Sequence, residues 1–97
     1  MAKFVYIYTG GSMPETEEEG QKVMKQWMDW LGGMGDHVTD VGNPFGASKA
    51  VNGGATLKAS GYSIVDAGSL DEATTHAKGC PVLERGGNVE VYEAIAM

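Results

Sequence analysis

The chain has 97 residues, of which 42% are hydrophobic, so its length and composition suit one folded domain over residues 1–97 and argue against a disordered chain. Its formal net charge of −6 has no offsetting basic stripe, which argues against nucleic acid and anionic membrane as partners. One cysteine, Cys80, excludes an internal disulfide and suits the cytoplasm, and the N-terminal segment lacks a signal-peptide cleavage site.

The first predicted elements are a strand and a long helix. Residues 3–9 are rich in aromatic and β-branched side chains and stop at a Gly-Gly pair, which indicates a strand. Ser12 begins a Ser-Met-Pro-Glu capping box, and apolar residues then recur at helical spacing. We therefore expect an amphipathic helix over residues 14–34 that ends near Gly32-Gly33, with an inward face formed by Val23, Trp27, Trp30, Leu31 and Met34.

The middle of the chain is rich in glycine. Residues 37–41 predict a short strand, and residues 61–67 predict another. Between them, an Asn-Gly pair within residues 50–55 is typical of a tight hairpin turn. The glycines of the whole segment 42–60 favour a loop that can open and close.

The C-terminal third predicts a second helix and a last strand. Ser69 opens a Ser-Leu-Asp-Glu capping box. The inward residues of the helix that follows are expected to be Leu70, Ala73 and Ala77. Residues 88–95 alternate apolar and polar side chains, as a half-buried strand does.

This order predicts an α+β, ferredoxin-like βαββαβ sandwich, with a four-stranded antiparallel sheet and two helices on one face. The first strand is apolar on both sides, with Phe4, Tyr6 and Tyr8 on one and Val5 and Ile7 on the other. A sheet that is apolar on both faces needs a cover on both, and two helices cover only one. We therefore expect a homodimer whose sheets pack face to face.

The C-terminal part of the chain resembles the YCII-related family. Residues 61–95 carry its pattern: a Gly-Tyr strand, a helix opening Ser-Leu-Asp-Glu-Ala, a Gly-Cys-Pro stop and a Gly-Gly turn into Val-Glu-Val. The N-terminal YIYTGG, the tryptophan-bearing helix and GNPFG are similar to one branch of the family, so the resemblance covers nearly the whole chain. It implies a dimeric α+β barrel, in agreement with the architecture argued above, and an activity that is mostly unassigned.

The chemistry suspected in that family has no matching residues here. The resemblance implies, for some members, a His–Asp pair with the His on the first helix, and a relative is linked to dehydrochlorination of a chlorinated aromatic. In this chain the helix over residues 14–34 has no histidine. The loop over residues 56–60 reads Thr-Leu-Lys-Ala-Ser where many members have Asp-Gly-Pro-Phe. The pair therefore cannot be carried over.

His37, which lies between Asp36 and Asp40, is the best local candidate for a general base, because a carboxylate can fix the tautomer and raise the basicity of an imidazole. In a regular strand, however, neighbouring side chains point to opposite faces. A polar turn between helix and strand is the favoured alternative. If the protein is an enzyme, we expect His37 and Asp40 to be its catalytic residues, in proton-transfer chemistry such as elimination or isomerisation.

Cys80 and His76 are four residues apart and can meet on one helical face. The C-terminal end of a helix disfavours a thiolate, so we expect Cys80 to be a small buried side chain and not a nucleophile. Two ligands do not make a metal site, and we expect no metal and no other cofactor. The strand-to-helix turn over residues 9–12 lacks the GxGxxG spacing of a phosphate site, and the glutamates after it would repel an anion.

Aromatic and sulfur-bearing side chains indicate a cleft between the first helix and the sheet. The predicted ligand-binding residues are Tyr6, Tyr8, Trp27, Met28, Asn43 and Phe45. The alternative, that most of these side chains simply form the core, stays open. The sequence thus predicts a cytoplasmic homodimer that binds a small apolar or aromatic organic molecule. A non-enzymatic regulatory or protein-interaction module is the alternative.

Overall fold

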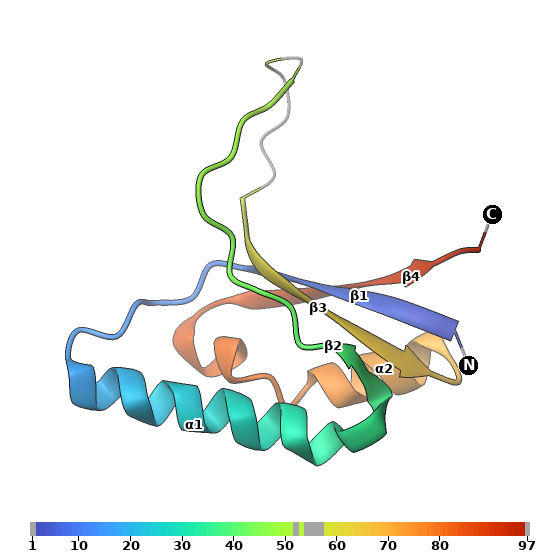
Figure 1. The fold of residues 1–97 in the computed structure, drawn as a ribbon, viewed down its shortest axis with the longest axis horizontal. Helices are drawn as coiled ribbons and strands as arrows, with labels where there is room; N and C mark the ends of the chain where they lie inside the picture. Colours follow the sequence, from blue (N-terminus) through green and yellow to red (C-terminus); the bar gives the residue numbers. More distant parts are fainter. Residues whose placement is uncertain (1, 52, 54–57, 97) are drawn as a thin grey trace.

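The computed structural model describes residues 2–51, 53 and 58–96. Its strands and helices are β1 (Ala2–Thr9), α1 (Glu17–Met34), β2 (Val38–Asp40), β3 (Ala59–Ala67), α2 (Leu70–Ala77) and β4 (Asn88–Ala94). A short 3-10 helix follows each α-helix: η1 (Gly35–His37) and η2 (Pro81–Arg85). The strands pair antiparallel in the order β2-β3-β1-β4, and both α-helices lie on the same side of the sheet (Figure 1). The predicted α+β, ferredoxin-like βαββαβ sandwich is confirmed. Within the described residues, no helix combines the length and apolarity needed to cross a bilayer.

α1 begins at Glu17 and not at residue 14. Its N-cap is Thr16, whose side-chain oxygen accepts a 3.0 Å hydrogen bond from the backbone N–H of Glu19. Ser12 instead pairs with η2, donating its backbone N–H to the Arg85 carbonyl at 3.0 Å. The predicted cap at Ser12 is therefore wrong, because the Thr-Glu-Glu-Glu run that follows it is a second capping box and starts the helix.

His37 does not lie in a strand. α1 continues through Gly32-Gly33, and Gly35 (φ 56°) then turns the chain into η1, which ends with His37. β2 covers only Val38–Asp40. The predicted strand over residues 37–41 is thus too long at both ends, and the argument from strand alternation does not apply to His37.

The start of α2 is as predicted. The Ser69 side chain accepts a 3.1 Å hydrogen bond from the backbone N–H of Glu72. Ala73 and Ala77 are buried, as expected. Leu70, which was expected to face inward, is 49% exposed, because it is the first residue of α2 and lies at the end of the helix.

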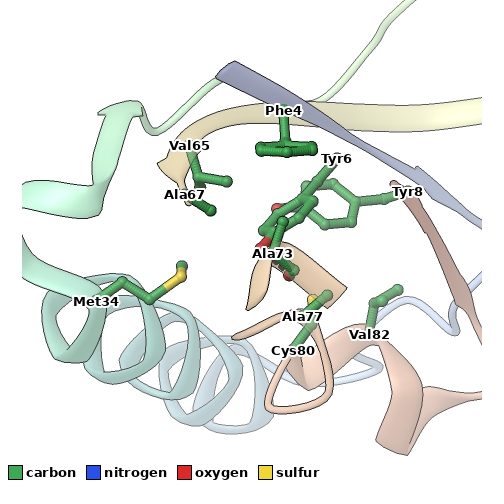
Figure 2. Close-up of a cluster of buried hydrophobic side chains, with 10 residues drawn as sticks. All are labelled: Phe4, Tyr6, Tyr8, Met34, Val65, Ala67, Ala73, Ala77, Cys80 and Val82. Atoms are coloured by element: carbon green, nitrogen blue, oxygen red, sulfur yellow. Dashed lines mark hydrogen bonds between the residues drawn. The ribbon is translucent and has the colours of Figure 1, made fainter. Parts of the chain in front are cut away.

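The core lies between the sheet and the two helices. β1 contributes alternate side chains, Phe4, Tyr6 and Tyr8, which point toward α2 and η2 in Figure 2. Tyr6 is completely buried, and its hydroxyl donates a hydrogen bond to the Ala73 carbonyl of α2. The remaining buried hydrophobic residues are Met34, Val65, Ala67, Ala73, Ala77, Cys80 and Val82. Cys80 is therefore the small buried side chain that the sequence predicted.

The opposite face of the sheet carries the other row of β1 and β3 side chains. Val5 pairs with Ile64, and Ile7 pairs with Tyr62, so these apolar side chains are neighbours on that face. All four are half-buried. The two apolar faces of β1 are as predicted. The homodimer argued from them stays a prediction.

After β2, the described part of the chain up to Val51 extends away from the body of the fold (Figure 1). Residues 43–49 and Val51 are exposed. The predicted hairpin turn within residues 50–55 lies largely outside the described residues.

Candidate functional site

A cavity of about 420 Å³ lies on the helix side of the sheet, between the first half of α1 and the start of β3. The connection from β1 to α1, the residues after β2, and η2 complete its walls. Its lining includes Tyr8, Ser12, Val23, Met24, Trp27, Gly42, Asn43, Ser60, Gly61, Ser63, Val82 and Arg85. The volume lies within the range of about 300–1,000 Å³ that is usual for small-molecule sites.

Two aromatic side chains meet at the cavity. The rings of Tyr8 and Trp27 lie 5.0 Å apart in an edge-to-face arrangement. Trp30, one helical turn further, packs edge-to-face on Trp27 at 5.7 Å and stacks on buried Tyr6 at 6.0 Å. This cluster joins the cavity wall to the core. The position of Trp27 is therefore held by aromatic packing on both sides.

A chain of hydrogen bonds runs along the sheet side of the cavity. The Tyr8 hydroxyl donates to the Ser63 hydroxyl at 2.8 Å, and Ser63 donates to the Val41 carbonyl at 2.7 Å. Burial raises the pKa of Tyr8 well above that of a free phenol, although the hydrogen bond with Ser63 opposes part of this shift. Tyr8 therefore stays protonated at neutral pH. It can donate or accept a hydrogen bond but cannot serve as a base.

Arg85 fixes the end of the cavity near the start of α1. Its Nε donates to the Ser12 carbonyl at 2.9 Å, and its Nη2 contacts the Glu19 carboxylate at 2.9 Å. The hydrogen bond from Arg85 lowers the pKa of Glu19. This pair ties η2 to α1 and neutralises the one cationic side chain among the described residues that line the cavity.

The rim formed by the residues after β2 is tied to β3. Gly42 has φ 78°, and a Cβ built on it would come within 1.6 Å of the Tyr62 carbonyl oxygen, so only glycine fits there. The Asn43 carbonyl accepts from the Tyr62 N–H at 3.3 Å, and the Phe45 N–H donates to the Ser60 carbonyl at 2.9 Å. The glycine at position 42 thus serves a close approach of two backbones, and it does not indicate an opening loop.

Three of the predicted ligand-binding residues, Tyr8, Trp27 and Asn43, line the cavity. The other three lie elsewhere. Tyr6 is enclosed in the core, and Met28 is 66% exposed outside the lining. Phe45 stacks on Tyr62 at 5.6 Å, beside the cavity and not in its wall.

The two predicted catalytic residues have different hydrogen-bond partners. Asp40 accepts a 2.8 Å hydrogen bond from the Gly42 N–H and a 3.4 Å hydrogen bond from the Tyr62 hydroxyl. His37 contacts the Asp66 carbonyl through Nδ1 at 3.1 Å. Neither His37 nor Asp40 lines the cavity.

Sequence reasoning did not identify the lining residues from the C-terminal half of the chain, among them Ser63 and Arg85. Ser63 could have been found, because it is the polar residue in the buried row of β3, which otherwise holds glycine, valine and alanine. Nothing in the sequence places Arg85 beside Glu19, since that contact depends on how η2 packs on α1.

Comparison of the sequence with protein-family models and with curated proteins finds no match. Comparison of the structure finds 5-chloro-2-hydroxyhydroquinone dehydrochlorinase from Burkholderia phenoliruptrix AC1100, solved in complex with 2,5-dihydroxybenzoquinone. The two chains superpose with a TM-score of 0.60 at 18% sequence identity, over 98% of this chain and 94% of the other. At this identity the similarity shows a shared fold.

Proposed function

We propose that the cavity beside Trp27 binds one small planar aromatic molecule. The observation that carries this proposal is the pairing of Tyr8 with Trp27 at the wall of a cavity of about 420 Å³. Aromatic rings attract another aromatic ring by stacked or edge-to-face packing. Few polar groups face the same space, which is typical of sites for small organic ligands.

The ligand class that we propose is a hydroxylated benzene or quinone. The Tyr8 phenol, the Ser63 hydroxyl and the Asn43 amide offer neutral hydrogen-bonding groups to such a ring. A structure of the same fold holds 2,5-dihydroxybenzoquinone, which supports this class as the first to test. We propose binding and not a defined reaction. Proton transfer by His37 and Asp40 stays a prediction, and their positions outside the lining do not favour it.

Titration calorimetry with 2,5-dihydroxybenzoquinone tests the proposal. We expect saturable binding at one site per chain, which Trp27→Leu weakens by about tenfold, the effect of losing an aromatic contact of about 1.5 kcal/mol. Met28→Leu is the matched control, because Met28 lies on the same helix but is exposed outside the lining. Far-ultraviolet circular dichroism establishes that both variants fold. Absence of binding at millimolar ligand, or equal losses in the two variants, would refute the proposal.

We also propose that a second copy of the chain covers the apolar face of the sheet around Val5, Ile7 and Ile64. The half-buried apolar row on that face supports a second copy as the partner. In a dimer with a two-fold axis, the same row of each chain packs against that of the other, so both apolar surfaces are covered. The resemblance to the YCII-related family, whose membership is itself a proposal here, implies the same arrangement. Sedimentation should give twice the monomer mass, and Ile7→Glu should give the monomer. Leu70→Glu, at an exposed site on the helix side, is the control and should leave the dimer intact.

A further inference from the structure

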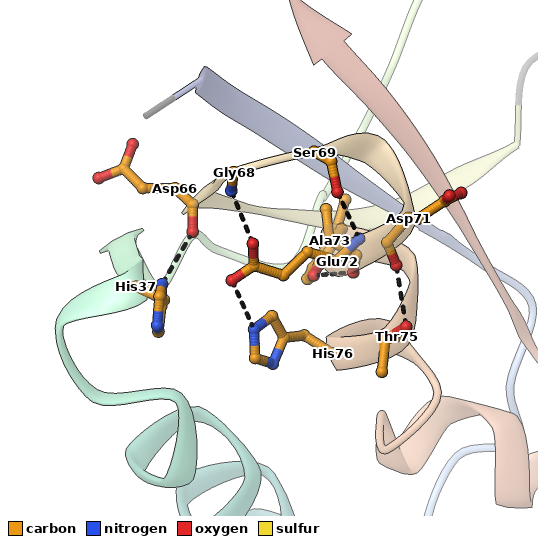
Figure 3. Close-up of polar contacts among 10 residues, drawn as sticks. His37, Asp66, Gly68, Ser69, Asp71, Glu72, Ala73, Thr75 and His76 are labelled. Carbon is orange, nitrogen blue, oxygen red and sulfur yellow. Dashed lines mark hydrogen bonds and ion pairs between the residues drawn. The ribbon is translucent and has the colours of Figure 1, made fainter.

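Three metal-ligating side chains from two distant parts of the chain meet near the end of β3 (Figure 3). His37 comes from η1, and Glu72 and His76 come from α2. One ligand atom from each residue lies within 4.8 Å of the other two. The cavity described above lies by the start of β3, and none of these three side chains lines it. This cluster is therefore separate from the proposed aromatic site.

The His37 ring is held through Nδ1 by a backbone carbonyl. Its Nδ1 lies 3.1 Å from the Asp66 carbonyl oxygen. A carbonyl oxygen only accepts hydrogen bonds, so in this contact Nδ1 carries the proton. The other nitrogen, Nε2, then has its lone pair free. A backbone carbonyl that fixes the tautomer and orientation of the ring is the usual support of a metal-binding histidine.

Glu72 is held in a similar way. Its Oε2 accepts a 2.9 Å hydrogen bond from the Gly68 N–H, and its Oε1 faces His76 (Figure 3). Oε1 lies 3.8 Å from His76 Nε2, which is too long for a hydrogen bond. His37 and Glu72 thus each have one polar atom held by the backbone and a second that this hydrogen bond leaves free.

His76 supplies a buried nitrogen without a partner. Among the residues that the structure describes, its Nε2 is buried and has no hydrogen bond. The rings of His37 and His76 lie 5.2 Å apart. The backbone at His76 is fixed by Trp30, whose Nε1 donates to the His76 carbonyl at 3.0 Å. A buried polar atom left unpaired is unfavourable, and coordination of a cation would satisfy it.

We propose that His37, Glu72 and His76 form a binding site for a divalent transition-metal ion such as Zn²⁺. Two imidazoles and one carboxylate are a ligand set of Zn²⁺ and non-haem Fe²⁺ sites in which water or substrate completes the coordination. Ligand atoms around tetrahedral Zn²⁺ lie about 3.3 Å apart, so the three side chains close by about 1.5 Å at most. We expected no metal from the sequence because His76 and Cys80 alone supply two ligands. Cys80 is in fact enclosed in the core, and His76 lies instead with Glu72 and His37.

Zinc titration of the tag-free protein, stripped beforehand with a chelator, tests the site. Calorimetry should show one Zn²⁺ per chain. The chain has two histidines, so nitrogen NMR of the imidazoles assigns the contact without ambiguity. We expect Zn²⁺ to shift Nε2 of His37 and of His76 together, while Nδ1 of His37 keeps its proton. Glu72→Gln and His37→Gln should each weaken binding by at least about tenfold.

Asp71→Asn is the matched control, because it removes a neighbouring carboxylate of α2 that is not part of the cluster. It should leave the affinity for Zn²⁺ unchanged. The imidazole spectra of metal-free His37→Gln and Glu72→Gln establish whether His76 keeps its native environment, so that loss of fold is not mistaken for loss of a ligand. Failure to bind Zn²⁺, binding that shifts only one histidine, or equal weakening by Asp71→Asn would each overturn the proposal.

Discussion

The Tyr8 phenol donates a 2.8 Å hydrogen bond to the hydroxyl of Ser63, which lies 55 positions away in the chain. The Ser63 hydroxyl in turn donates a hydrogen bond to the Val41 carbonyl. Ser63 takes part in both of these hydrogen bonds and Tyr8 in one, so removing the two side-chain hydroxyls should have different effects on stability. In Tyr8→Phe, Ser63 keeps its bond to Val41, and we expect a loss of about 0.5–1.5 kcal/mol in the free energy of unfolding. In Ser63→Ala, both the phenol and the carbonyl lose a partner, and the loss should be about 1–3 kcal/mol. Urea denaturation measures both values.

The double variant separates the shared hydrogen bond from the other effects. Because Tyr8 and Ser63 are in direct contact, the losses in the double variant should be smaller than the sum of the two single losses. Full additivity would mean that the 2.8 Å contact contributes nothing to stability.

The N-cap of α1 gives a second prediction. Thr16→Ala removes the side-chain oxygen that accepts the Glu19 N–H, so it should lower the free energy of unfolding by about 1 kcal/mol. Ser12→Ala is the control, because the described hydrogen bonds of Ser12 to Arg85 use its backbone. That change should stay within about 0.5 kcal/mol. The opposite ranking in thermal or urea unfolding would restore Ser12 as the cap.

These caps illustrate how far local patterns predicted the fold. Ser69 and Thr16 both begin a Ser/Thr-x-x-Glu pattern, and both are N-caps. Ser12 begins a third, so the pattern predicted that a helix starts here but could not choose between two consecutive boxes. The choice depends on tertiary contacts, since the backbone of Ser12 is used by Arg85 of η2. β1 was predictable because its run of aromatic and β-branched side chains, which includes buried Phe4, Tyr6 and Tyr8, is a local property of the sequence.

The site was predictable in part for the same reason. The periodicity of the sequence predicted that Tyr8 and Trp27 point toward the space between helix and sheet, and both line the cavity. The same rule could not say which inward residues reach the cavity and which are enclosed, as Tyr6 is. The approach of His37 to His76 depends on the η1 turn and on its contact with Asp66, and no local pattern reports either.

A pair of glycines offers a third prediction. In Gly42→Ala, the new Cβ would meet the backbone carbonyl of Tyr62 in a residue whose φ is 78°, so we expect a loss of more than about 1 kcal/mol. At Gly46, no atom of the described residues apart from its chain neighbours lies within 4 Å of a built Cβ, and φ is not positive. Gly46→Ala should therefore be neutral or stabilise by up to about 1 kcal/mol. Thermal unfolding of the two variants compares them directly. Equal effects would show that the close approach at Gly42 does not occur.

The buried phenols predict a loss of stability in alkali. Burial raises the pKa of Tyr6 from its ordinary value of 10.0 to about 12, and it shifts Tyr8 in the same direction. Below about pH 10 these phenols keep their protons in both states, so their contribution to stability is fully present. As the pH rises above 10, the unfolded chain releases these protons while the native protein retains them. The free energy of unfolding should therefore fall between about pH 10 and pH 12.

Two measurements check this prediction. Phenolate absorbance of the native protein should show fewer tyrosines ionising near pH 10 than in the protein unfolded by urea, with the remainder appearing as the protein unfolds. Burial also raises the pKa of the Cys80 thiol, from 9.0 to about 11, so the decline should begin nearer pH 9. Cys80→Ala removes this earlier part and leaves the later one. If the unfolding midpoint of the wild-type chain were constant from pH 8 to pH 11, burial of these groups in the core would be contradicted, since a buried neutral acid must bind its proton more tightly than the unfolded chain does.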